Sequence, residues 1–445
     1  MNGSSAFQLA SLGAGCWRSD LGLSLSAAGA AGAAVHLAGA AWLYLWDRHC
    51  CLRPGSSRLT AAVPLVALNL VLPLLFCRSQ DAITMLITVF NLTWLSTFKA
   101  LSWALNRGPL CMPGLTPIQF LAVYATPVTP VASTGQSTSG QPPASKGGAS
   151  AAAGSAGGQS SDGSGGSAAT RQAGGGEPPQ GGRVAEAYPA QRMPRVGSQG
   201  RLGEDAGSST GMLLSWLGKL ALIAIMVWVM QQPLPGLARS FAYALALYSL
   251  LSAIMDGPAS LVIGLTGLRV SPHFDRPWMA TSVAGFWSKH WDLAAGNTLR
   301  QLVYDPVCEG RWVAPPGGAV PPAQPSGARM VLGTAASFAA SGAVHEIIFW
   351  YLTGRTTGGI WLCFFAAQAP LVVAERAALA ALKLRGIRVP TLLRRVVTLL
   401  LLVYAGQLLF WPPAMEHGVV SSLIANTQAG ILQLTAAARV VLPPR

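Results

Sequence analysis

The sequence has 445 residues, of which 51% are hydrophobic and only 10% are charged, and its formal net charge is +14. Because a soluble domain carries about 25% charged residues, this composition excludes an ordinary soluble protein and indicates a membrane protein. A basic balance can also indicate nucleic-acid binding, but here Lys and Arg lie in loops beside apolar runs, so we expect no nucleic-acid partner.

Several apolar runs are long enough to cross a bilayer as helices, which takes about 20 residues. They lie near residues 25–46, 60–77, 82–103, 212–230, 238–268, 329–353, 358–374 and 395–411, with a weaker run near 418–440. Gly257-Pro258 interrupts the fifth run, which is either one kinked helix or two shorter pieces. The expected fold is all-α: a polytopic transmembrane helix bundle of about 8–9 spans.

The segment from residue 126 to about 210 differs from the rest of the chain. It is rich in Gly, Ser and Ala and nearly free of large apolar residues. Such a segment cannot bury enough surface to offset the entropy of ordering, so it is predicted to be a disordered linker. The expected organisation is a tail (1–24), helices one to three (25–103), a loop with the linker (104–210), helices four and five (211–268), a long loop (269–328) and the carboxy-terminal helices (329–445).

The seven cysteines show no CxxC pair and no Cys/His cluster at zinc spacing. We therefore expect no disulfide framework and no structural metal.

The distribution of Lys and Arg predicts an orientation. The loops rich in them follow the first helix, hold the linker, cover residues 269–329 and cover residues 375–395. If 238–268 is one span, all four loops fall on the same side of the membrane. The positive-inside rule makes that side the cytosol, so the amino terminus is expected to face the lumen.

The loop at 268–307 has a pattern typical of an interfacial helix. On a helix, Trp287, Trp291, Ala294, Ala295, Thr298 and Leu302 would share one side, while Lys289, Asp292 and Arg300 would lie off it. Tryptophan at head-group depth with charges facing water is typical of a surface anchor.

His345 and Glu346 stand side by side in the apolar run "GAVHEIIFWYL". Ser341 and Gly342 precede them and form a small-residue face that another helix or a ligand can approach. Ionisable residues at membrane depth usually mark function, and the alternative for His345 is a packing hydrogen bond to a neighbouring helix. Glu346 either orients His345 or lies on another face, since adjacent helical positions point about 100° apart.

Several motifs, in order along the chain, resemble those of plant wax synthases, a branch of the membrane-bound O-acyltransferases. They are "TWLSTFKALSWALNRGPL" (93–110), "FWSKHWDLAAGNTLRQLVYDPV" (286–307), "FAASGAVHEIIFWYL" (338–352) and "LLVYAGQLLFWPPAM" (401–415). The resemblance covers most of the apolar chain and leaves out the linker.

The resemblance implies an acyl-CoA-dependent O-acyltransferase that forms a wax ester from a long-chain alcohol, in the membrane of the endoplasmic reticulum. His345 matches the histidine of the superfamily and is the expected general base. Asp292 is the second expected catalytic residue, although these enzymes commonly have Asn there; an ionised Asp accepts hydrogen bonds but cannot donate them. The loop at 269–328 becomes a cytosolic signature loop, whose expected acyl-CoA-binding residues are Phe286, Trp287, Lys289, His290, Trp291, Arg300 and Tyr304. Asn297 and Glu346 are possible supporting residues.

Acyl-CoA is then a co-substrate, and no cofactor or metal is implied. Alternatives remain open at this point. The same chemistry could use a sterol or a diacylglycerol as acceptor, because the shape of the acceptor pocket is not readable from the sequence. A polytopic transporter is the non-enzyme alternative, although a transporter would more often show several intramembrane charges and related halves.

Overall fold

The computed structural model describes residues 16–78, 80–131, 209–315 and 325–441. Within them it is almost entirely helical, and one isolated antiparallel bridge joins Pro130 to Val270. Most of the predicted linker lies outside the described residues.

Eight helical stretches of the described chain are long and apolar enough to cross a membrane, which confirms the predicted helix bundle. In chain order they contain α2 (Leu25–His49), α3 (Ser56–Val71), α4 (Ala82–Thr88) with α5 (Thr97–Ala104), α7 (Ser209–Val229), α8 (Gly236–Thr266), α12 (Gly327–Thr353), α13 (Ile360–Ala366) with α14 (Gln368–Leu384), and α15 (Thr391–Ala405) with α16 (Trp411–Glu416). The weaker ninth run forms a helix, α17 (Val419–Val441), but is not among the eight. Pro258 lies inside α8, so the interrupted run is one helix.

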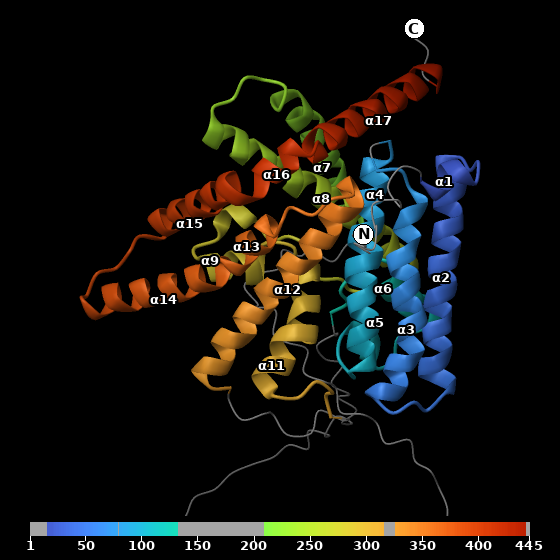
Figure 1. Ribbon diagram of the computed structural model, residues 1–445, viewed down its shortest axis with the longest axis horizontal. Helices are drawn as coiled ribbons and strands as arrows, with labels where there is room; N and C mark the ends of the chain where they lie inside the picture. The colour runs from blue at the N-terminus through green and yellow to red at the C-terminus, as the bar shows by residue number, and fades with distance from the viewer. Residues whose placement is uncertain (1–15, 79, 132–208, 316–324, 442–445) are drawn as a thin grey trace, which may run out of the picture. The chain divides into compact units, whose positions relative to one another are not determined.

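The helices pack as neighbouring pairs: α7 lies along α8, α3 along α5, and α12 along α13 (Figure 1). A short helix that the sequence analysis missed, α6 (Pro117–Ala125), contacts α2. It begins with a capping box in which Thr116 and Gln119 exchange hydrogen bonds, a pattern that satisfies the free N–H groups of a helix start. The 104–210 segment is therefore not only a loop.

Residues 126–131 were predicted to belong to the linker, and this part of the prediction is wrong. The buried Lys99 ammonium donates hydrogen bonds to the carbonyls of Val123 (2.7 Å), Thr126 (2.5 Å) and Val128 (3.3 Å). These three bonds satisfy all three donors of a buried ammonium and fix the chain that leaves α6. That chain pairs with residues 269–271, at the start of the loop at 269–328.

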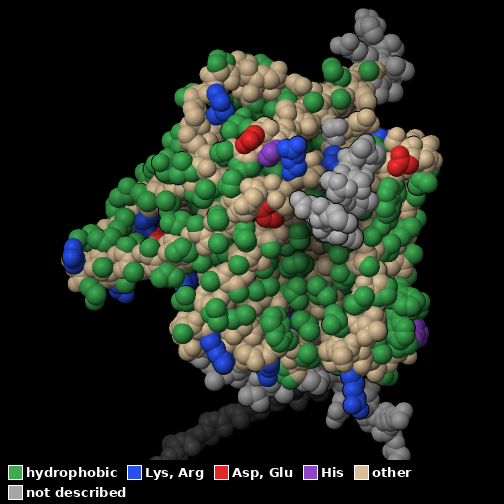
Figure 2. Space-filling view, viewed as in Figure 1, with side chains coloured by type: hydrophobic (Ala, Val, Ile, Leu, Met, Phe, Trp, Pro, Cys, Tyr) green, Lys and Arg blue, Asp and Glu red, His purple; other side chains and the backbone are tan. Residues whose placement is uncertain are grey.

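The two ends of the bundle differ in chemistry. At the end of the bundle where α3 begins, drawn at the bottom of Figure 1, the chain is rich in arginine. Arg58 donates to the Trp103 carbonyl, and Arg107 pairs with Glu309 at 2.6 Å. Figure 2 shows Lys and Arg side chains at this end, below α11 (Asp305–Glu309) and α12.

At the other end, a disulfide joins Cys16 to Cys77, and Arg18 pairs with Asp81 at 3.0 Å. The expectation that the cysteines form no disulfide framework is therefore wrong for one pair. The two cysteines are 61 positions apart, and their spacing in the sequence is not diagnostic of a disulfide. They come together because α1 (Trp17–Asp20) packs against the turn Leu72–Leu75 that follows α3.

Candidate active site

A cavity of about 650 Å³ lies among α8, α12, α13, α14, α15 and the signature loop. His345 and Asp292 both line it, as do many aromatic and aliphatic side chains contributed by helices far apart in the sequence. A concave, mostly apolar cavity with a few polar groups is typical of a site for a small molecule.

The signature loop is not one interfacial helix, so that prediction is wrong. From residue 283 to residue 309 it contains α9 (Val283–Gly285), a π-helical turn (Phe286–His290), α10 (Leu293–Leu299), a second π-helical turn (Arg300–Tyr304) and α11. The break lies at Asp292, whose φ of 38° is left-handed. The Asp292 carboxylate caps α10 by accepting the Ala295 N–H at 3.1 Å, and the Leu293 N–H donates to the His273 carbonyl at 2.8 Å. Both bonds satisfy donors that a helix start leaves free, which is why the chain can break here.

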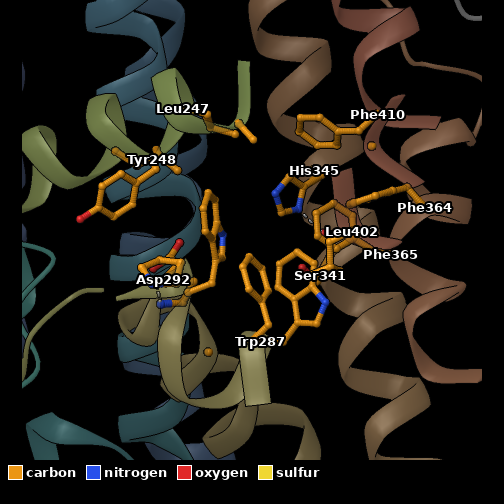
Figure 3. Close-up of a pocket in the computed structure, with 18 of the residues that line it drawn as sticks. Leu247, Tyr248, Trp287, Asp292, Ser341, His345, Phe364, Phe365, Leu402 and Phe410 are labelled. Carbon is orange, nitrogen blue, oxygen red and sulfur yellow. Dashed lines mark hydrogen bonds between the residues drawn. The ribbon is translucent and has the colours of Figure 1, made fainter. Parts of the chain in front are cut away.

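His345 is held in one orientation at the cavity wall. Its Nδ1 lies 2.7 Å from the Ser341 carbonyl, and its ring stacks on Phe365 with centroids 3.9 Å apart. Figure 3 shows the imidazole between Phe410 and Phe365, facing the space opposite Asp292. Because a carbonyl only accepts, Nδ1 must carry the hydrogen, which leaves Nε2 of the neutral ring as a lone pair.

Glu346 does not bond to His345. Its carboxylate accepts hydrogen bonds from the Thr357 N–H (2.9 Å), the Thr357 hydroxyl and the Leu362 N–H (3.3 Å). Glu346 therefore lies on another face than His345, the second alternative left open by the sequence, and there it anchors the start of α13. Since Phe365 belongs to α13, Glu346 also helps to place the ring that stacks on His345.

The small-residue face predicted at Ser341 and Gly342 is where α13 approaches α12. A Cβ atom added at Gly342 would lie 2.8 Å from the Leu362 Cα and 3.1 Å from its carbonyl oxygen. Both are backbone atoms, so a larger residue can be accommodated only if the two helices separate.

Gly342→Ala is therefore expected to destabilise the protein by about 1–3 kcal/mol, the usual cost of overpacking, and to lower activity by displacing α13. Thermal unfolding in micelles and turnover measure the two effects. The matched control is Gly218→Ala, because nothing lies within 4 Å of a Cβ at that helical position. Equal stability of Gly342→Ala and Gly218→Ala would show that the close approach is unimportant.

Asp292 is buried, with 7% of its surface exposed, and its carboxylate has no hydrogen bond to His345. Burial raises the pKa of Asp292 to about 7, although the Ala295 N–H opposes this shift. An ordinary Asp ionises near 3.9, so the ionised form is disfavoured in the folded protein.

The sign of the resulting pH dependence follows from this raised pKa. Below about pH 4 Asp292 is protonated in both the folded and the unfolded protein. As the pH rises towards 7, Asp292 ionises in the unfolded chain but stays largely protonated in the folded protein, so the free energy of unfolding falls. Asp292→Asn keeps a good helix cap and cannot ionise. The difference in melting temperature between Asp292→Asn and the wild type is expected to grow from pH 4 to pH 8. A difference independent of pH would contradict this.

The structure brings together most of the residues predicted to bind acyl-CoA, but not all of them. Those that line the cavity are Phe286, Trp287, Trp291, Arg300 and Tyr304, together with Asn297. Lys289 and His290 are absent from the lining, and His290 Nδ1 hydrogen-bonds to the Asp275 carbonyl. Arg300 is paired with Asp305 at 3.4 Å.

Sequence reasoning missed the cavity residues that come from other helices. Gln368 is fully buried and accepts a hydrogen bond from the Trp287 indole at 3.2 Å, while Trp94 packs edge-on against His345 with centroids 5.2 Å apart. Arg376 of α14 also lines the cavity. Trp94 lies within the motif at 93–110, but no spacing signal in the sequence relates Gln368 or Arg376 to the motifs.

A buried ionic network beside the site was also missed. Asp256 of α8 accepts hydrogen bonds from the Lys219 ammonium of α7 and from His273 Nδ1 at 2.8 Å. The His273 backbone in turn accepts the Leu293 N–H beside Asp292. The network thus connects two membrane helices to the turn that carries Asp292. Its only sequence signal was a lone acid and a lone lysine in neighbouring apolar runs.

Comparison with known proteins matches the same region of the chain. Residues 270–366 match the model of the membrane bound O-acyl transferase family. The chain is 30% identical to probable long-chain-alcohol O-fatty-acyltransferase 7 of Arabidopsis thaliana, over 36% of this chain and 45% of the relative. It is 25% identical to acyl-CoA–sterol O-acyltransferase 1 of the same plant, over 49% of this chain and 60% of the relative. It is 23% identical to probable long-chain-alcohol O-fatty-acyltransferase 3, over 84% and 86%. In the first three matches, the aligned part of this chain covers about half of the relative's length.

Proposed function

We propose, on the premise that this chain resembles the wax synthase-like branch of the membrane-bound O-acyltransferase superfamily, that it transfers a fatty acyl group from acyl-CoA to the hydroxyl of a long-chain alcohol. The observation that carries the proposal is the orientation of His345, whose Nε2 lone pair is available at the wall of a large apolar cavity.

A lipid alcohol is a poor nucleophile until a base removes its proton during attack, and histidine suits this role at neutral pH. In the proposed reaction, Nε2 of His345 takes the hydroxyl proton as the alcohol oxygen attacks the thioester carbonyl. The carbon–sulfur bond then breaks, and CoA leaves as a thiolate. No side chain is acylated, and Cys308 is not needed as a nucleophile.

The surroundings of His345 favour this reaction over hydrolysis. Phe365, Phe410 and Trp361 have ring centroids between 3.9 and 6.4 Å from the imidazole. Aromatic walls exclude water, which limits loss of the thioester to hydrolysis and suits an acyl chain.

We further propose that the Arg-rich end of the bundle and the signature loop face the cytosol, where acyl-CoA is found, in a membrane such as that of the endoplasmic reticulum. The positive-inside rule supports this orientation. A protease site inserted into the 132–208 segment should be cut from the cytosolic side of sealed vesicles, and protection there would overturn the orientation.

A sterol acceptor is the second candidate, because one relative is named as an acyl-CoA–sterol O-acyltransferase. The deciding experiment gives the purified protein in micelles labelled acyl-CoA and a panel of acceptors: long-chain alcohol, sterol and diacylglycerol. We expect ester with the long-chain alcohol. Ester with sterol alone would support the second candidate, and no ester with any acceptor would refute the enzyme assignment.

A further inference from the structure

The helices α14 and α15 form two arms that meet at the turn Arg385–Pro390 (Figure 1). They carry a cluster of cations: Arg376, Lys383, Arg385, Arg388, Arg394 and Arg395. No Asp or Glu occurs in the sequence from residue 377 to residue 415. Figure 2 shows Lys and Arg among hydrophobic side chains at the tip of these arms.

Arg376 lines the cavity, and Arg395 lies near a part of α15 that lines it. Arg376 lines the cavity from α14, and Leu399, Leu402 and Val403 line it from α15. Positions four apart share a helix face, so Arg395 lies one turn before Leu399 on the cavity side of α15. α14 therefore presents a guanidinium at the cavity wall, and α15 carries Arg395 one turn away from a lining residue.

These arginines have no anionic partner among the residues that the structure describes. Nε of Arg394 and Nε of Arg395 are shielded from solvent, and no described group accepts a hydrogen bond from them. The nearby acids are engaged elsewhere: the Glu375 carboxylate accepts the Val283 N–H at 2.9 Å, and Asp275 pairs with Arg276 at 3.3 Å.

The cations of the signature loop that were first expected to bind acyl-CoA are less available to a phosphate. Arg300 is paired with Asp305, and neither Lys289 nor His290 lines the cavity. Arginine is the side chain best suited to phosphate, because its planar fork donates two parallel hydrogen bonds to an oxyanion.

We propose that Arg376, Arg394 and Arg395 form a phosphate-binding site at the mouth of the cavity between α14 and α15. A phosphate has two possible sources here: the nucleotide end of acyl-CoA, or the headgroup of an anionic phospholipid beside the arms. The first source rests on the proposed function, and the second does not.

Binding measurements distinguish the two sources. The probes are hexadecyl-CoA, an unreactive thioether that keeps the nucleotide phosphates, and hexadecyl-pantetheine, which lacks them. A third arm measures the melting temperature of the protein in nanodiscs of phosphatidylcholine with or without phosphatidylserine. The test variant is Arg376→Gln/Arg395→Gln in the full chain. The control is Arg355→Gln, an exposed cation in the loop between α12 and α13.

If the site holds CoA phosphate, the double variant should bind hexadecyl-CoA at least about tenfold more weakly and bind hexadecyl-pantetheine as the control does. If it holds a lipid headgroup, hexadecyl-CoA binding should be unchanged and the stabilisation by phosphatidylserine should be lost. A double variant that matches the control in every arm overturns the site. Because no arm requires turnover, the site can stand even if the acceptor panel yields no ester. The Arg376→Lys/Arg395→Lys variant keeps both positive charges. Its comparison with the Gln variant separates loss of charge from a folding defect.

Discussion

Replacing His345 with alanine is expected to lower kcat for acyl transfer by about 10²–10⁴-fold, the usual contribution of a positioned general base. The imidazole is oriented by its hydrogen bond to Ser341 and by stacking on Phe365, so alanine removes the base and leaves the apolar cavity in place. Transfer of a labelled acyl group to the preferred acceptor measures the effect. Binding of hexadecyl-CoA should be nearly unchanged, because His345 acts on the alcohol.

The matched control for this variant is His49→Ala, since His49 is an exposed histidine at the end of α2. It should retain wild-type activity. Melting temperatures of both variants separate loss of chemistry from loss of folding. If His345→Ala folds and turns over at the wild-type rate, His345 is not the base.

Asp256→Ala is expected to cost about 3–5 kcal/mol of stability, the range observed when one partner of a buried ion pair is removed. Asp256 is 4% exposed and bonds to both Lys219 and His273, so its loss leaves an ammonium and an imidazole without their acceptor inside the bundle. Unfolding followed by heat or denaturant in micelles gives the size of the effect.

A second variant separates the cost of an unpaired charge from a general loss of packing. Lys219→Met/Asp256→Leu replaces both charges by apolar groups and should recover much of the lost stability, because buried ion pairs are often no better than well-packed apolar residues. Asp20→Ala, at an exposed acid, serves as the surface control. A double variant as unstable as Asp256→Ala would show that the carboxylate matters for another reason.

The spans were predictable because the signal is local. A membrane helix must satisfy its own backbone within one segment, so a run of about 20 apolar residues is sufficient evidence. The close approach at Gly342 was predictable for the same reason, since small residues permit helix contact wherever they occur. Neither inference requires knowledge of which helix comes next to which.

The site itself depends on non-local contacts, and there the sequence was less informative. The helical pattern at 286–302 concealed the break at Asp292, which forms because the His273 carbonyl accepts the Leu293 N–H. The role of Glu346 was undecidable from its position, because its partners are Thr357 and Leu362 on another element. The resemblance suggested Lys289 and His290 as acyl-CoA-binding residues, whereas Arg376, and neither of these two, lines the cavity.

The Cys16–Cys77 disulfide has a consequence for how the chain matures. Disulfides form and persist in oxidising compartments, so this end of the bundle would meet the lumen in the orientation proposed from the charges. The bond joins the segment before α2 to the segment that follows α3. Once it forms, these two helices are covalently tethered at this end and cannot drift apart in the plane of the bilayer. The first hairpin of the bundle can then act as a fixed template against which the later helices assemble.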